Sequence, residues 1–324
     1  MITIREIAEA ADVSIATVSR AMNAPDTVAE PTLHRIQKTI KDLGYAPNKI
    51  ARSLKSHESK TVGLITSDIT NPFLVKILKG AEEILFDAGY TPIIYDSEEN
   101  LEKENRYLYD LIERRIDGLI FVPVLERDSC PRILKNLPTV FVDRALNHSR
   151  DCVKSNNATG ITLLVNHLYR RGRRKIALVG GPAASIVGCE RTEAFLSVCK
   201  ELGIQTQENF IIESDFTAAG GYDAACKLLD MKTNPDAIVS ANNLMGIGIL
   251  KAMRDRNISC PEEIEIATFD ELGELVGARY SYIQQPAHEM GAEAARMLLA
   301  RISGQETRKP RVVQFGPTLH FNAF

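Results

Sequence analysis

The first sixty residues constrain this chain most, because they place two short helices on either side of a three-residue turn. Thr3 and Glu6 have the spacing of a capping box, and apolar residues at helical spacing carry a first helix to about Ala11. Ser14 ends the turn and is a good N-cap for a second helix over residues 15–22. A helix-turn-helix with a turn of this length is typical of proteins that place the second helix in the major groove of DNA.

A third helix, predicted over residues 31–43, closes this head. It is expected to complete a small core with four apolar residues, Leu33, Ile36, Ile40 and Leu43. The second helix then begins with Ile15, Ala16 and Thr17, the positions that contact base edges in such motifs. Apolar side chains there suit thymine methyl groups, whereas Arg20, one turn later, suits O6 and N7 of guanine.

Two short helices and a polar turn occur in many proteins, but three further motifs narrow the assignment. The pattern VS..TVSR..N covers residues 13–23, V.E.T..RI covers 28–36 and L.Y.PN..AR.L covers 43–54. Together they resemble the DNA-binding head of the LacI family of bacterial repressors, and the resemblance continues to about residue 318. Within that family, ARSLK at residues 51–55 is most similar to the ribose and purine repressor branch.

The resemblance implies a set of DNA contacts, carried over position by position. They are Thr3, Ser14, Ile15, Ala16, Thr17, Ser19, Arg20, Asn23, Tyr45, Arg52, Leu54 and Lys55. It also implies that residues 47–60 form a hinge helix and linker, in which Leu54 wedges between base pairs in the minor groove. Residues 48–56 have little to pack against, so we expect them to fold only on DNA. The alternative is that Leu54 is a single apolar residue in a linker.

The charge distribution bears on how many heads bind at once. The net charge of −3 disfavours nucleic acid at first sight, but residues 1–60 hold nine Lys and Arg against seven Asp and Glu. One such mildly basic head should bind DNA weakly, whereas two heads on one site double the phosphate contacts. We therefore expect a homodimer on a palindromic operator of double-stranded DNA.

The remaining composition predicts a cytoplasmic globular protein. A chain of 324 residues corresponds to about two domains. No apolar run approaches the ~18 residues of a membrane helix, and the first residues lack a signal-peptide pattern, so we expect no membrane association. Six scattered cysteines without a CxxC pair argue against a disulfide framework or a zinc site.

From residue 61 onward, apolar strands alternate with helices, which is typical of parallel α/β sheets. Strands are predicted at 61–66, 91–96, 118–124, 138–144, 175–180, 210–213, 237–242 and 265–269, and helices at 73–88, from 101, and at 158–171, 189–202, 218–229 and 245–256. The pattern starts again after Asn157, which predicts two similar lobes with a cleft between them.

The predicted fold is therefore an all-α helix-turn-helix head, a hinge helix and a two-lobed α/β domain, which the resemblance implies to be periplasmic-binding-protein-like. The boundaries are 1–46 for the head, 47–60 for the hinge and linker, and 61–324 for the large domain. Lobe one is expected at about 61–157 and 287–316, and lobe two at about 158–286 and 317–324.

Ligands of such sheets bind beyond the carboxyl ends of the strands. Eight residues there align by local motif with family positions that contact an effector: Phe73, Asp143, Arg144, Arg191, Phe216, Asn242, Asp270 and Gln285. Aromatic faces can cover C–H patches while Asp, Asn and Arg bind hydroxyls, so the set fits a small polyol, a sugar or sugar derivative, better than a purine. The two arginines also favour a sugar acid or sugar phosphate, because Arg binds carboxylate and phosphate bidentately.

Simpler interpretations stay open for several of these residues. Phe73 and Phe216 can be core residues, and Asp270 can form a structural ion pair with Arg191 across the cleft. The sequence also departs from the family pattern, at Asn156-Asn157, Asn243, Gln284 and the tail 317–324. No leucine heptad follows residue 304, so a dimer is expected in place of a tetramer.

No arrangement of catalytic residues stands out. The chain has no HExxH, GxSxG, Walker A or GxGxxG motif, and its six histidines show no i, i+4 pairing, so we expect no enzyme activity, cofactor or metal. The sequence instead favours a DNA-binding transcriptional repressor controlled by a small-molecule effector. The alternatives are a sugar-binding protein without a DNA role, against which the head argues, and a sugar-processing enzyme, which requires a catalytic set.

Overall fold

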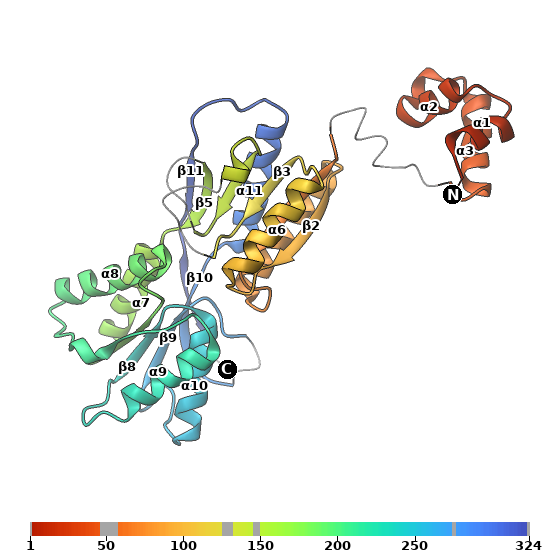
Figure 1. Cartoon of the computed structure of the whole chain (residues 1–324). Coiled ribbons are helices and arrows are strands. Elements are labelled where there is room, and N and C mark those ends of the chain that lie inside the picture. Colours follow the sequence, from red (N-terminus) through yellow and green to blue (C-terminus); the bar gives the residue numbers. More distant parts are fainter. Residues whose placement is uncertain (1, 46–57, 125–131, 145–149, 274–276, 323–324) are drawn as a thin grey trace. The chain divides into compact units, whose positions relative to one another are not determined.

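The computed structural model describes residues 2–45, 58–124, 132–144, 150–273 and 277–322 (Figure 1). The chain divides into two compact units, Met1–Ser59 and Lys60–Phe324. The predicted hinge residues Arg52, Leu54 and Lys55 lie outside the described residues.

The first unit is a helical head with the predicted helices. Its elements are α1 (Ile4–Ala10), α2 (Ile15–Asn23), the 3-10 turn η1 (Pro25–Thr27) and α3 (Glu30–Asp42). The capping box is confirmed, because the Thr3 amide donates to the Glu6 carboxylate at 2.6 Å and the Glu6 amide donates to the Thr3 hydroxyl at 3.4 Å. Ser14 caps α2 by accepting from the Thr17 amide at 3.0 Å. Both caps satisfy amides that the first turn of a helix leaves without partners.

The head has a core built from all three helices. Ile7, Val18 and Ile36 are fully buried in it. The prediction that Leu43 belongs to this core is wrong, since its side chain is 38% exposed. The helix ends at Asp42 and the chain turns at Gly44 (φ 61°), so that Tyr45 packs against the core instead.

The second unit contains two six-stranded sheets with helices on both faces. In lobe one the strand order is β11-β5-β4-β3-β1-β2, and in lobe two it is β12-β10-β9-β8-β6-β7. The strands of lobe one are β1 (Thr61–Thr66), β2 (Thr91–Asp96), β3 (Gly118–Phe121), β4 (Thr139–Val142), β5 (Asp151–Ser155) and β11 (Val312–Phe315). Those of lobe two are β6 (Ile176–Gly180), β7 (Ile211–Glu213), β8 (Ala237–Ser240), β9 (Glu265–Phe269), β10 (Tyr280–Gln284) and β12 (Thr318–Asn322). All neighbouring strands are parallel except the antiparallel pair β10 and β12.

Helices cover each sheet from two sides, and the core clusters lie between them (Figure 1). In lobe one, α5 (Pro72–Asp87) and α11 (Ala287–Ile302) pack on one face and α6 (Leu101–Glu113) on the other. In lobe two, α7 (Asn157–Arg170) and α8 (Ile186–Glu201) cover one face and α9 (Ala218–Leu229) and α10 (Asn243–Asp255) the other. The predicted start of α8 at residue 189 is wrong by one turn, because Ser185 caps the helix earlier.

The chain passes between the lobes after β5, after β10 and after β11. The tail that departs from the family pattern makes the third passage and ends as β12, an edge strand paired with β10. His320 lies opposite Tyr282 there, and their rings stack at 5.5 Å. Because the two sheets share the same strand order, the carboxyl ends of equivalent strands bring equivalent residues to the cleft.

Glycines allow the closest helix contact in lobe one. A Cβ at Gly80 on α5 would overlap the carbonyl oxygen of His288 on α11, and a Cβ at Gly291 would overlap that of Ile77. A backbone oxygen cannot rotate away as a side chain can, so larger residues at these positions would push the helices apart.

We predict that Gly80→Ala lowers the free energy of unfolding by about 1–3 kcal/mol, although alanine alone favours a helix by up to about 1 kcal/mol. Urea denaturation measures the change. Gly316→Ala is the matched control, because a Cβ there meets nothing within 4 Å. Equal stability of the two variants would contradict the packing argument.

Candidate DNA-binding surface and effector pocket

The exposed surface of α2 combines apolar groups with one guanidinium. Ile15 is 48% exposed, and Ala16 and Arg20 are also exposed. Thr17 is half-buried and its hydroxyl lies 2.8 Å from that of Ser14, so both take part in the helix cap. The exposed predicted residues of α2 are therefore an apolar pair and an arginine, side chains that suit thymine methyl groups and guanine.

The other predicted DNA contacts differ in their surroundings. Thr3 is exposed and Ser19 half-buried, while Tyr45 is half-buried against the head's core. Asn23 is the last residue of α2. The DNA contacts of all twelve predicted residues stay a prediction.

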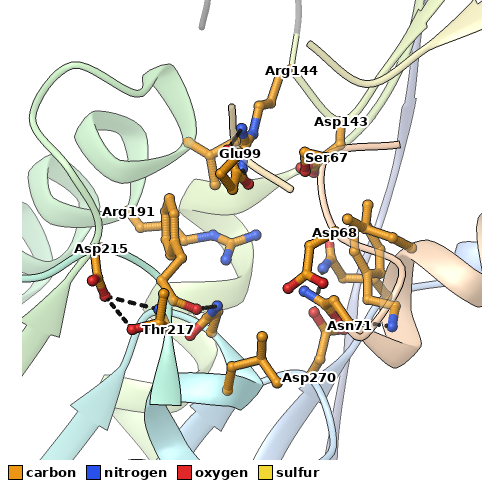
Figure 2. A pocket seen from close by; sticks show the side chains of 17 residues that line it. Ser67, Asp68, Asn71, Glu99, Asp143, Arg144, Arg191, Asp215, Thr217 and Asp270 are labelled. Carbon is orange, nitrogen blue, oxygen red and sulfur yellow. Dashed lines mark hydrogen bonds and ion pairs between the residues drawn. The ribbon is translucent and has the colours of Figure 1, made fainter. Parts of the chain in front are cut away.

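All eight predicted effector residues line one pocket between the lobes (Figure 2). The space between the side chains measures about 560 Å³, including the part open to solvent. Nine further residues of the wall were not predicted from the sequence, namely Ser67, Asp68, Asn71, Leu74, Glu99, Val187, Asp215, Thr217 and Leu244. Asn71 and Thr217 had a usable signal, since both are N-caps of helices that follow strands.

Two aspartates occupy equivalent positions in the two lobes. Asp143 follows β4 and Asp270 follows β9, and each amide donates to a carbonyl of the next strand at 2.8 Å, Val153 and Ile283 respectively. Both have left-handed backbones, with φ of 65° and 68°, and so does Phe216 with φ of 65°. Such conformations are costly for residues other than glycine and concentrate at functional sites, where the surrounding structure holds them.

Arg144 is held in the wall of lobe one. Its guanidinium makes a bidentate ion pair with Glu99 at 2.8 and 2.6 Å and donates to the carbonyls of Pro123 and Val124 at 3.1 and 3.0 Å. Glu99 therefore offsets the charge that would attract an acidic effector. No local motif pointed to Glu99, which reaches Arg144 from a separate loop with a left-handed backbone (φ 51°).

Arg191 is the cation that points into the middle of the pocket (Figure 2). It is buried, donates from Nε to Asn157 at 2.8 Å and from Nη1 to the Ala241 carbonyl, and stacks on the Phe269 ring at 3.6 Å. Within the described chain no carboxylate oxygen lies within 4.0 Å of an Arg191 nitrogen, so the alternative of an ion pair between Arg191 and Asp270 does not hold. Burial lowers the pKa of Arg191, while the charges of Asp143 and Asp270 oppose this shift.

Three oxygen atoms of the pocket wall are buried without a hydrogen-bond partner among the described residues. They are Asp143 Oδ1, Gln285 Oε1 and Ser67 Oγ. Each such atom costs free energy unless a partner binds it. Two of the three can only accept, so a ligand with hydroxyl donors would satisfy them.

Burial also governs the protonation of the two equivalent aspartates. It raises the pKa of Asp143, and it raises the pKa of Asp270 to about 6, against the charge of Arg191 and a 2.7 Å hydrogen bond from Gln285 Nε2. Near neutral pH the Asp270 carboxylate is thus a strong acceptor whose charge the site only partly compensates.

The aromatic residues and Asn242 have structural roles as well. Phe73 is buried in the core of lobe one and Phe216 packs against that of lobe two, so the core interpretation holds for both, yet each also lines the pocket. Asn242 caps α10 by accepting from the Met245 amide at 2.9 Å and donates to the Phe216 carbonyl at 2.8 Å. Its amide is thereby fixed in orientation.

Two departures from the family pattern lie where the lobes meet. Asn156 caps α7 by accepting from the Thr159 amide at 3.0 Å. Asn243 of lobe two donates to the Asn71 side chain of lobe one at 3.2 Å. Because Asn71 caps α5, this contact joins the helix ends of the two lobes at the pocket.

In the part of the chain that the structure describes, no group of three His, Cys, Asp or Glu residues could hold a metal ion. None of the described helices is both long enough and apolar enough to cross a membrane.

Two family models match parts of the chain. Residues 3–48 match the model of the bacterial regulatory proteins of the lacI family, and residues 165–321 match that of the periplasmic binding protein-like domain. The ribose operon repressor of Escherichia coli (strain K12) is 30% identical over 325 residues, which cover 98% of either chain. The chain belongs to the LacI family. It is thus a DNA-binding transcriptional regulator, and the predicted fold class is confirmed.

Other members extend this likeness. The HTH-type transcriptional repressor PurR of Photobacterium profundum is 31% identical over 98% of this chain and 97% of its own. The solved structure of the lac repressor dimer bound to operator and the anti-inducer ONPF has the same fold, with a TM-score of 0.85 at 22% identity over 98% and 97% of the two chains. That of the transcriptional regulator CelR with cellobiose has a TM-score of 0.74 at 27% identity over 99% and 98%. These relatives are repressors and regulators and not enzymes.

We predict that Asp270→Asn removes a pH dependence of stability. The folded protein binds the Asp270 proton more tightly than the unfolded chain, so this group lowers stability as pH rises from about 4 to about 6. The difference in free energy of unfolding between the variant and the wild type should rise in favour of the variant by about 1–2 kcal/mol from pH 4.5 to pH 7. This value is reduced for partial solvent screening. Urea denaturation at the two pH values measures this, and an equal difference at both would contradict the raised pKa.

Proposed function

We propose that this LacI-family regulator is a repressor that binds a palindromic operator as a homodimer, under the control of a sugar or sugar derivative in the pocket between the lobes. One observation carries the proposal. The wall combines the guanidinium of Arg191 with acceptors on Asp143, Gln285 and Ser67 that have no hydrogen-bond partner in the described part of the chain, and the same chain carries an exposed recognition helix.

The charges of the wall favour a neutral ligand over a sugar acid or sugar phosphate. Once the pair of Arg144 and Glu99 is set aside, four carboxylates remain against Arg191 alone, those of Asp68, Asp143, Asp215 and Asp270. A carboxylate or phosphate on the ligand would be repelled by most of these groups. Hydroxyls can donate to Asp143 and accept from Arg191 without adding charge.

Control of DNA binding requires that the sugar bind two conformations of the protein with different affinity. The pocket draws residues from both lobes, and Asn71 and Asn243 join them at its edge. A ligand that bridges the lobes stabilises the closed arrangement. The hinge residues 47–60 would transmit this change by pairing in the DNA-bound dimer, with Leu54 in the minor groove. The alternative of a sugar-binding protein without a DNA role leaves the head unexplained.

A thermal-shift screen tests the pocket. D-Ribose, cellobiose and other neutral sugars should raise the melting temperature more than sugar acids, sugar phosphates or purines, because binding to the folded state stabilises it by mass action. Asp143→Asn and Arg191→Met should remove the shift, while the control Glu262→Gln, in an exposed ion pair of lobe two, should keep it. A larger shift with a sugar phosphate would contradict the charge argument.

The head is tested by operator titration, on a duplex selected from a random library by the full-length protein. Arg20→Ala should weaken binding by about 5- to 150-fold and relax the preference for guanine at one position of each half-site, since a bidentate contact contributes about 1–3 kcal/mol. Arg296→Ala, which removes an exposed charge on α11, is the control. Equal losses for both variants would mean that Arg20 contributes only charge.

A further inference from the structure

A chain of hydrogen bonds links the pocket arginine to the opposite lobe. Lys154 on β5 of lobe one donates to Glu190 Oε1 on α8 of lobe two at 2.7 Å. Glu190 Oε2 accepts from Asn157 Nδ2 at 2.8 Å, and Asn157 Oδ1 accepts from Arg191 Nε at 2.8 Å. These residues surround the first passage of the chain between the lobes, where β5 ends and α7 begins.

The bonding pattern fixes the direction of each group. Lys154 and Arg191 can only donate, so an acceptor must face each of them. Glu190 supplies one oxygen to Lys154 and the other to the amide nitrogen of Asn157. That leaves the amide oxygen of Asn157 toward Arg191, and the reversed amide would put two donors face to face.

We propose that Glu190 is a positioning residue: held by Lys154 of the opposite lobe, it orients the Asn157 amide and thereby aims the Arg191 guanidinium into the pocket. Lys154 and Glu190 do not line the pocket, and their side chains are 20% and 32% exposed, whereas Asn157 and Arg191 are buried. The inference deepens the proposed function, because it makes the aim of a pocket residue depend on contact between the lobes.

Three substitutions of Glu190 separate orientation of the amide from attachment of the lobes. Glu190→Gln keeps an oxygen for the Asn157 amide but loses the ion pair with Lys154. The charge swap of Lys154→Glu with Glu190→Lys restores an ion pair between the lobes but offers Asn157 only a donor. Glu190→Met removes both.

The readouts are the water exchange of the Arg191 Nε–H signal in ¹⁵N spectra, assigned by its loss in Arg191→Lys, and the melting temperature. Both use the full chain without added sugar, so their outcome is independent of the identity of the effector. A lost hydrogen bond to a charged group should speed the exchange about ten- to a hundredfold.

We expect Glu190→Gln to have a lower melting temperature than the wild type but to keep its Arg191 Nε–H protected from exchange. We expect the charge swap to have a melting temperature close to that of the wild type but a fast-exchanging Nε–H. Glu190→Met should have both a lower melting temperature and a fast-exchanging Nε–H, whereas the control Glu262→Gln should resemble the wild type in both. The proposal is overturned if the charge swap protects Nε–H as the wild type does, or if the Gln and Met variants lose protection equally. Either result would reduce Glu190 to a structural ion-pair partner.

Discussion

Burial of polar atoms at the ends of two parallel sheets is the constraint on which the effector domain depends. Parallel strands with the same order in both lobes bring their carboxyl ends to one cleft, and side chains that leave these ends are taken out of water. Asp143 and Asp270 show the consequence, because they hold strained backbones and carboxylates whose charge the protein only partly compensates. A site of this kind is stabilised by whatever supplies the missing donors.

The two arginines of the pocket differ in their partners. Arg144 is paired with Glu99 and anchored to two carbonyls, so it serves as part of the wall. Arg191 donates to neutral groups instead, the Asn157 amide and the Ala241 carbonyl, so its charge is not offset by a paired carboxylate and its guanidinium points into the pocket. Two residues of one type thus have different roles, which their partners decide.

The sequence was sufficient to predict those features of the fold and the pocket that depend on local residue patterns. Strand-end reasoning and family motifs placed all eight predicted residues on one pocket, since a residue that follows a buried parallel strand has little choice of location. Partners could not be predicted in the same way. Glu99 reaches Arg144 through a loop far away in the chain, and Asp270 takes Gln285 in place of Arg191, because such pairings depend on tertiary geometry. The prediction for Leu43 was wrong for a local reason, because the helix ends at Asp42, one residue before the apolar pattern does.

If the effector pocket and the DNA-binding head share one conformational equilibrium, the binding of sugar and the binding of operator are thermodynamically linked. The affinity for the selected operator should be measured as a function of the concentration of the neutral sugar that gives the largest thermal shift. We predict that operator affinity changes to a plateau, and that operator DNA changes the affinity for the sugar by the same factor, as thermodynamic reciprocity requires. Saturating sugar that leaves operator affinity unchanged would contradict the account and reduce the pocket to a binding site without regulatory effect.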